Sequence, residues 1–184
     1  MLQIAVILGS TRPNRVGEIV ANWVMEVAAK RDDAEFTLID LAQVDLPFFD
    51  EGMPPLTGQY EQRHTQEWAA TVARFDAYVF VTAEYNHSIP GALKNAIDFV
   101  HAEWNNKAAG FVSYGANSGI RAVEHLRLVL AELQVATVRA QVALDSYADF
   151  ENYYDFKPTD RHEGLLDDVF DQVIAWGTAL KQLR

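Results

Sequence analysis

The sequence predicts an α/β fold in which a five-stranded parallel sheet lies between two layers of helices. The order of apolar segments along the chain predicts it. Apolar segments of strand length alternate five times with segments in which apolar residues recur at helical spacing. Such alternation builds a parallel sheet with right-handed crossovers and with helices on both faces. The length of 184 residues suits one α/β domain, so we expect residues 1–184 to form a single domain.

The individual elements follow from composition and punctuation. Five apolar segments are predicted strands: residues 3–8, 35–41, 77–82, 108–114 and 135–144. Five segments with amphipathic spacing are predicted helices: residues 16–27, 61–74, 90–100, 120–133 and 166–180. Proline and glycine interrupt residues 43–60, and residues 145–158 are irregular and rich in aromatic side chains. We expect the four tryptophans, Trp176 included, to lie mainly in the core.

Composition excludes several classes of function. The net charge of −11 argues against a nucleic-acid partner, because binding a phosphate backbone depends on many Lys and Arg side chains. Cysteine is absent, which excludes disulfides and cysteine nucleophiles. No apolar run reaches the roughly 18 to 20 residues of a membrane span. The first residues also lack the basic region and cleavage site of a signal peptide. We therefore expect a cytoplasmic protein without membrane insertion.

Three polar loops follow predicted strands and begin predicted helices. They are residues 9–14, 83–88 and 113–119. Two strand orders are common in doubly wound sheets of this size. In the flavodoxin-like order 2-1-3-4-5, the first two loops are neighbours and the third lies beside the second. The three loops would then meet in one crevice at the carboxyl edge of the sheet, where α/β proteins bind their ligands.

The first loop has the parts of a phosphate site. Ser10 and Thr11 offer hydroxyls, Arg12 and Arg15 offer positive charge, and the following helix offers free N–H groups. The alternative is an ordinary strand-to-helix turn with a solvated arginine. Neither a P-loop nor a GxGxxG motif is present, which argues against ATP or a Rossmann-type dinucleotide.

The other two loops carry polar groups that suit a flat heterocycle, although Tyr85 and Tyr114 could equally be surface aromatics. Catalytic side chains are not evident. The GxSxG motif of a nucleophile elbow is absent, and the five histidines are scattered without an HExxH motif. We expect no metal site and no catalytic acid, base or nucleophile among the side chains.

Three segments of the chain resemble a known family. GSTRPNRVGE, TAEYNHSIPGALKNAIDF and SYGANSGIRAVEHLR are similar to signature segments of the NAD(P)H-dependent FMN reductases. These are flavodoxin-like flavoproteins that include quinone, chromate and azo-dye reductases. The resemblance spans residue 1 to about residue 144. It implies FMN as cofactor and NADPH or NADH as co-substrate.

The resemblance also implies which residues bind FMN. The phosphate would lie on Ser10, Arg12, Val16 and Gly17. The ring would lie along Ala83, Glu84, Tyr85 and Asn86, with Ser113, Tyr114 and Gly115 at its far side. The chain departs from the family at two places. Ala83 replaces a usual proline, so we expect a less rigid loop. Arg15, Val16 and Gly17 replace a common serine and asparagine, so we expect Arg12, Arg15 and backbone amides to hold the phosphate.

The implied reaction is a ping-pong transfer of hydride through FMN to a small acceptor: a quinone, an azo or nitro compound, chromate or free flavin. The flavin carries the chemistry, and amides of the third loop and of the helix after it would stabilise negative charge on the ring. The alternative is a flavodoxin-type electron carrier that docks protein partners. The resemblance further implies a homodimer or homotetramer. The proline-rich residues 43–60 and the aromatic residues 145–158 are candidates for a subunit interface or for lids over the flavin.

Overall fold

Five parallel strands lie at the centre of the molecule. The computed structural model describes all 184 residues. The strands are β1 (Leu2–Leu8), β2 (Ala34–Asp40), β3 (Ala77–Ala83), β4 (Lys107–Gly115) and β5 (Val135–Asp145). Their order in the sheet is β2-β1-β3-β4-β5, and every neighbouring pair is parallel. The predicted fold class and the predicted strand order are both confirmed.

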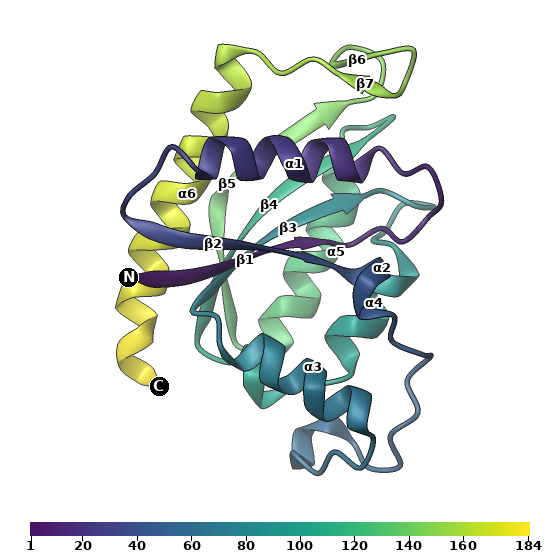
Figure 1. Ribbon diagram of the computed structural model, residues 1–184, viewed down its shortest axis with the longest axis vertical. Helices are drawn as coiled ribbons and strands as arrows, with labels where there is room; N and C mark the ends of the chain where they lie inside the picture. The colour runs from purple at the N-terminus through teal and green to yellow at the C-terminus, as the bar shows by residue number, and fades with distance from the viewer.

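Helices cover both faces of this sheet (Figure 1). They are α1 (Gly17–Ala28), α2 (Leu41–Val44), α3 (Arg63–Ala73), α4 (Gly91–Asp98), α5 (Ile120–Glu132) and α6 (Asp160–Leu180). Side chains of α1 and α6 share one hydrophobic core with one face of the sheet, and α3, α4 and α5 share a second core with the other face. None of the helices combines the length and the apolar character that crossing a membrane would require.

The two segments predicted as irregular contain short elements. Residues 43–60 overlap α2 and include a 3-10 turn, Pro55–Thr57. Residues 145–158 include an antiparallel hairpin of β6 (Phe150–Glu151) and β7 (Asp155–Phe156). Phe156 of the hairpin packs edge-on against Trp23 of α1, with ring centroids 5.1 Å apart. Elements of two or three residues depend on such tertiary contacts, so periodicity does not reveal them.

Two helix boundaries and one core assignment differ from the predictions. The helix after β3 ends at Asp98, although the apolar pattern continues to Val100, which is buried after the helix. Helix α6 begins at Asp160, six residues before its first predicted apolar position, because Thr159 and His162 form a capping box. The prediction that Trp176 is a core residue is wrong: it is 48% exposed, because the neighbouring positions Val173 and Gly177 face the sheet instead.

Candidate functional site

The loop between β1 and α1 leaves a row of backbone donors without partners. Val16 stands at the N-cap of α1 with helical backbone angles, and no side chain caps the helix. The backbone N–H groups that donate to no protein oxygen are those of Ser10, Thr11, Asn14, Arg15, Val16, Gly17 and Glu18. Free donors at a helix N-terminus, together with the positive end of the helix dipole, attract an anion.

A hydrogen bond joins this loop to the loop after β3. The hydroxyls of Ser10 and Tyr85 lie 2.7 Å apart. Gly9 also donates its N–H to the carbonyl of Val81, at 3.0 Å. These contacts confirm the prediction that the first and second polar loops are neighbours, which follows from the pairing of β1 with β3.

The guanidinium of Arg15 is committed to the protein, so the expectation that it would help to hold a phosphate is wrong. It donates to the carbonyl of Ser10 at 2.8 Å and pairs with Asp40 at 2.5 Å and with Glu18 at 2.7 Å. Its side chain is only 6% exposed, and two carboxylates balance its charge. Arg12, by contrast, is exposed and forms no ion pair, which leaves it as the available cation of this loop.

The loop after β3 is a tight two-residue turn. Tyr85 and Ser88 exchange backbone hydrogen bonds of 2.8 and 3.1 Å. Between them, Asn86 and His87 have φ values of 48° and 73°, which is the left-handed backbone that such hairpin turns require. Both side chains are exposed at the tip of the turn. Ala83 precedes the turn as the last residue of β3, where the ladder with Tyr114 of β4 already constrains it.

Glu84 connects this loop to helix α5. Its carboxylate accepts hydrogen bonds from the N–H groups of Arg121 and Ala122, at 3.1 and 3.3 Å, and pairs with the Arg121 guanidinium. Its side chain is 5% exposed. The first amides of α5 are therefore occupied, which corrects the expectation that they face a ligand ring. The carboxylate caps the helix, where negative charge is favourable.

A hydrogen bond between two of its own residues holds the loop after β4 in shape. Ser113 is fully buried, and its hydroxyl donates to the carbonyl of Ser118 at 2.7 Å. Gly119 has a φ of +67°, and a Cβ there would come within 2.9 Å of the backbone nitrogen of Tyr114. Ser113 therefore supports the turn. The donors that this loop leaves open are the N–H groups of Ala116, Asn117 and Gly119.

Tyr114 points away from its own loop and toward α1. Its ring belongs to the core that α1 shares with the sheet, and it is 8% exposed. A Cβ on Gly17 would come within 2.4 Å of the Tyr114 hydroxyl oxygen. Burial raises the pKa of that hydroxyl well above the usual value for tyrosine, the nearby Ser10 hydroxyl lowers it slightly, and no protein group makes a hydrogen bond of ordinary geometry to it. The site thus contains a protonated, unpartnered hydroxyl at the first turn of α1.

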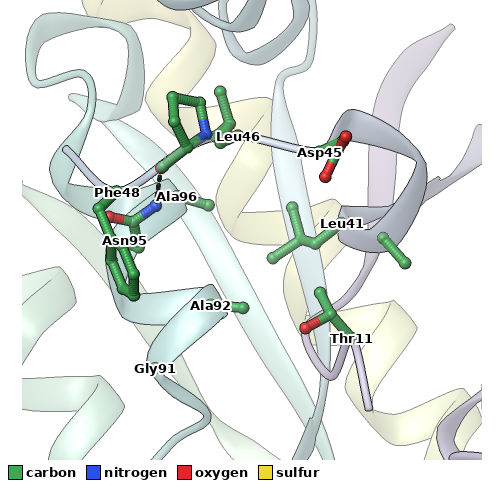
Figure 2. Close-up of a pocket in the computed structure, with 11 residues that line it drawn as sticks. Thr11, Leu41, Asp45, Leu46, Phe48, Gly91, Ala92, Asn95 and Ala96 are labelled. Carbon is green, nitrogen blue, oxygen red and sulfur yellow. Dashed lines mark hydrogen bonds between the residues drawn. The ribbon is translucent and has the colours of Figure 1, made fainter. Parts of the chain in front are cut away.

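A cavity of about 690 Å³ opens on the other side of the β1–α1 loop (Figure 2). Thr11 lines one wall, and the first turns of α4 line another. The third wall is the segment after α2, which Asn95 of α4 holds in place. Its amide donates to the carbonyl of Pro47 at 2.7 Å and accepts from the N–H of Phe49 at 3.0 Å. The lining residues are Thr11, Leu41, Ala42, Asp45, Leu46, Pro47, Phe48, Gly91, Ala92, Asn95 and Ala96.

The predicted residues therefore lie close together, but some of them face the open donors and others make structural hydrogen bonds. Ser10, Gly17 and Tyr114 meet at the start of α1, while Glu84 and Ser113 make structural hydrogen bonds. Sequence reasoning missed Asp40, the partner of Arg15. A signal was available: Asp40 ends the strand that the expected order puts beside the β1 loop.

Fold and site together define a class: an α/β flavodoxin-like protein whose first helix is uncapped and has open N–H groups. The fold is similar to that of a flavoenzyme NAD(P)H:(acceptor) oxidoreductase, FerB from Paracoccus denitrificans, with a TM-score of 0.75. That likeness covers 97% of this chain and 98% of the other at 21% identity, so it shows the fold alone.

The model of the family described as NADPH-dependent FMN reductase matches residues 2–149, and the chain belongs to this family of oxidoreductases. It is 38% identical over 149 residues to an NAD(P)H-dependent FMN reductase of Nectria sp, covering 76% of this chain and 74% of that protein. It is 27% identical to a quinone reductase of Escherichia coli K12, covering 100% of this chain and 97% of that protein. The resemblance seen in the sequence is confirmed.

Proposed function

We propose that this chain binds FMN and uses NADH or NADPH to reduce small acceptors, with quinones as the acceptor class. One observation carries the proposal: a chain of the FMN reductase family has an uncapped first helix whose N–H groups and neighbouring buried hydroxyl lack protein partners. Quinone reductases among its relatives, such as that of Escherichia coli, support the acceptor class.

The donors at the first loop fit the phosphate of FMN. The phosphate would accept hydrogen bonds from the open amides of Val16 and Gly17 and from the hydroxyl of Ser10. Arg12 would add positive charge, since it is exposed and has no carboxylate partner. Arg15 would act indirectly: its hydrogen bond to the Ser10 carbonyl fixes the loop from below.

The other two loops fit a flat ring. Bound FMN would supply the redox chemistry, accepting a hydride from the nicotinamide and delivering electrons to the acceptor. The protein would position the ring along residues 83–86 and leave the N–H groups of Ala116 and Asn117 as donors to its edge. Donors fixed in advance stabilise negative charge that develops during a reaction. No acid, base or nucleophile is assigned to a side chain.

Reconstitution with FMN followed by reduction tests the proposal. The expected result is a yellow protein whose absorbance near about 450 nm bleaches with NADH or NADPH alone and returns with a quinone. A single site that serves both substrates in turn predicts parallel lines in double-reciprocal plots. Azo dye, nitro compound, chromate and free flavin are compared as acceptors. A protein that remains colourless with excess FMN would overturn the proposal.

A flavodoxin-type electron carrier is the second candidate. The net charge of −11 favours it, and the fold is also similar to a short-chain flavodoxin, with a TM-score of 0.59 at 13% identity. The two candidates differ in their reductant. An FMN-loaded protein that stays oxidised with NADH and NADPH, but is reduced through a partner protein, would establish the carrier.

We also propose that the chain forms a homodimer or homotetramer. The side chains of Phe48, Leu56 and Leu128 support this, because they are 92%, 73% and 74% exposed in the single chain. Sedimentation velocity at micromolar concentration should give the mass of two or four chains. A mass of one chain across that range would contradict the proposal.

A further inference from the structure

The hydroxyl of Tyr114 is a hydrogen-bond donor that the folded chain leaves unused. The residue is 8% exposed, and its hydroxyl has no partner in the protein. Burial raises the pKa of Tyr114 well above its usual value, so the proton stays on the oxygen at physiological pH. Leaving such a group buried and unpaired is unfavourable, because it loses its hydrogen bond to water. Such groups are rare in native proteins, and a catalytic or ligand-binding role is one of the reasons for which they are kept.

The position of the Tyr114 hydroxyl, beside the first turn of α1, indicates which kind of ligand it would bind. It lies against Gly17, because a Cβ built there would come within 2.4 Å of the hydroxyl oxygen. Gly17 is the first residue of α1, a helix of 12 residues whose first turn has free amides. The hydroxyl therefore adds a donor to the N–H groups that already face an anion at this helix end.

A second pair of hydroxyls supports the same assignment. Ser10 is fully buried, and its oxygen lies 2.7 Å from that of Tyr85. In that pair one hydroxyl donates to the other, so one of the two protons remains for another acceptor. The Ser10 hydroxyl also interacts with that of Tyr114, which places the three hydroxyls together at this loop.

We propose that Tyr114 is a ligand of the FMN phosphate, and that Gly17 lacks a side chain so that this hydroxyl can reach the first turn of α1. The inference rests on the proposed function and deepens it. The family resemblance implied that Tyr114 contacts the ring. Its only polar atom lies at the other end of the site, beside the helix that would receive the phosphate.

Binding of two flavins to the variant Tyr114→Phe tests this assignment. FMN carries the phosphate, whereas riboflavin has the same ring without it. Tyr114→Phe should weaken FMN binding roughly 10- to 100-fold, as expected for a lost hydrogen bond to a charged group, and leave riboflavin binding unchanged. The phosphorus NMR signal of bound FMN should also shift. Tyr147→Phe is the matched control, because Tyr147 is 66% exposed and its hydroxyl has no partner.

Stability without flavin provides an independent readout. Tyr114→Phe removes an unpaired buried hydroxyl while keeping the ring, so the flavin-free variant should unfold at the same or a higher urea concentration than the wild type. A residue needed only for packing or folding would not combine unchanged stability with weakened FMN binding.

Each other outcome overturns the assignment in a recognisable way. Equal weakening of FMN and riboflavin would make Tyr114 a ring contact. Unchanged FMN binding would make the hydroxyl irrelevant to the phosphate. A wild-type protein that binds neither flavin would overturn the proposed function itself, and this result is distinct from the other two because it does not depend on the variant.

Discussion

Gly17 shows how a single missing side chain shapes the site. A Cβ at this position would meet the Tyr114 hydroxyl at 2.4 Å and a methyl group of Leu8 at 2.7 Å. Contacts this short do not occur in folded proteins, so any larger residue must displace the ring of Tyr114 or the first turn of α1.

Gly17→Ala should therefore lower the free energy of unfolding by about 1–3 kcal/mol, as overpacking does. Urea unfolding measures the change. Gly164→Ala is the matched control, because Gly164 lies in helix α6 with open space around its Cβ position. That change should be neutral or stabilising by up to about 1 kcal/mol, since alanine favours helices. Equal stability of the two variants would show that the close approach at Gly17 is absent.

The carboxylate of Glu84 joins two loops of the site through the start of α5. Glu84→Gln keeps the shape but removes the charge that faces two amides and the Arg121 guanidinium. We expect a loss of about 1–3 kcal/mol in the free energy of unfolding. Glu124→Gln, at an exposed position of the same helix, should stay within about 0.5 kcal/mol of the wild type. If both variants behave alike in urea, Glu84 does not have the capping role described.

At the scale of elements, one side chain of α4 supplies the hydrogen bonds between that helix and the segment after α2. Asn95 makes both hydrogen bonds to it, with Pro47 and Phe49, and the segment forms a wall of the 690 Å³ cavity (Figure 2). Leu46 packs against the second core and Phe49 meets Phe99 edge-on, with ring centroids 5.3 Å apart, whereas Phe48 is 92% exposed. Local opening of such a segment is governed by the few bonds that hold it.

Asn95→Ala should free this segment without unfolding the sheet. Losing two hydrogen bonds should speed hydrogen exchange at the amide of Phe49 by about tenfold, because that amide loses its acceptor. Mass spectrometry of exchanged peptides measures the change. Asn22→Ala, at an exposed position of α1, is the control. Unchanged exchange near Phe49 would mean that other contacts hold the wall.

The β6–β7 hairpin lies just outside the residues that match the family. The family match ends at residue 149, just before the hairpin begins. Ser146 donates its N–H to the carbonyl of Gly115 at 3.1 Å, which ties the start of this segment to the loop after β4. Tyr147 and Tyr153 meet edge-on with centroids 5.4 Å apart and are both exposed. The hairpin therefore presents aromatic surface beside the third polar loop.

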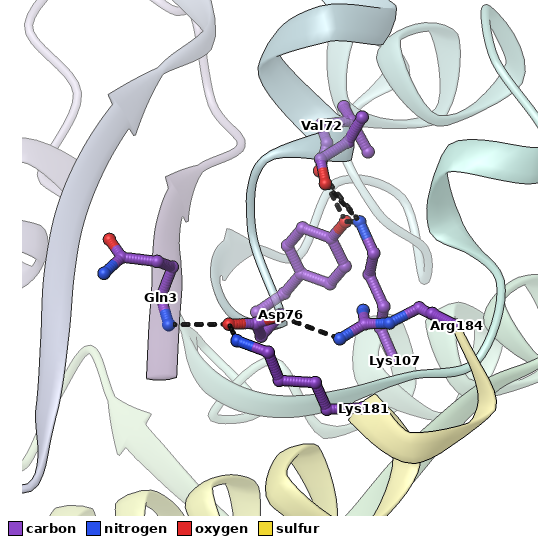
Figure 3. A network of polar contacts seen from close by, with 8 residues as sticks. Gln3, Val72, Asp76, Lys107, Lys181 and Arg184 are labelled. Atoms are coloured by element: carbon purple, nitrogen blue, oxygen red, sulfur yellow. Dashed lines mark hydrogen bonds and ion pairs between the residues drawn. The ribbon is translucent and has the colours of Figure 1, made fainter. Parts of the chain in front are cut away.

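At the scale of the whole molecule, a buried lysine lies at the amino end of strand β4, whereas the site lies at the carboxyl ends of the strands. Figure 3 shows the polar contacts of this lysine. Lys107 is 3% exposed, and its ammonium donates to the carbonyl of Val72 and to the hydroxyl of Tyr78, both at 2.9 Å. Nearby, Asp76 pairs with Lys181 and with Arg184, each at 2.8 Å, and this holds the C-terminus against the sheet. Burial, with a smaller effect of Arg184, lowers the pKa of Lys107 to about 7.

This lysine should make stability depend on pH between 7 and 9.5. In the unfolded chain the pKa of lysine is near its usual value of 10.5, so over this range the unfolded state binds more protons than the folded state. The free energy of unfolding must then rise with pH. The expected rise is about 2–3 kcal/mol, since one pKa unit corresponds to about 1.4 kcal/mol.

Lys107→Met should remove most of this rise, as measured by urea unfolding at several pH values. Lys30→Met, at an exposed position, should keep it. Measurements stay below pH 9.5 because Tyr60 has an opposite effect at higher pH. Burial and Glu103 raise the pKa of Tyr60 to about 12, so the folded state holds this proton more tightly than the unfolded state, and stability falls as the pH increases beyond about 10. A constant difference between the wild type and Lys107→Met across the range would contradict the prediction.

Much of this protein could be predicted from its sequence. Alternating strand and helix patterns determine the α/β fold, because burial of apolar faces at periods of 2 and 3.6 residues leaves few other arrangements. The residue types of the three polar loops were sufficient to identify the family, and they predict a ligand at the carboxyl edge of the sheet. These features depend on residues that are close together along the chain, so the sequence alone is enough to recognise them.

Only the tertiary structure decided how the side chains divide the work. The sequence treats Arg12 and Arg15 alike, yet Asp40, far along the chain, pairs with Arg15 and leaves Arg12 free. It likewise gives no sign that Glu84 caps α5 or that Tyr114 lies beneath Gly17. The physical reason is that charge pairing, capping and close packing depend on distances between residues on different strands, and these distances exist only once the sheet has formed.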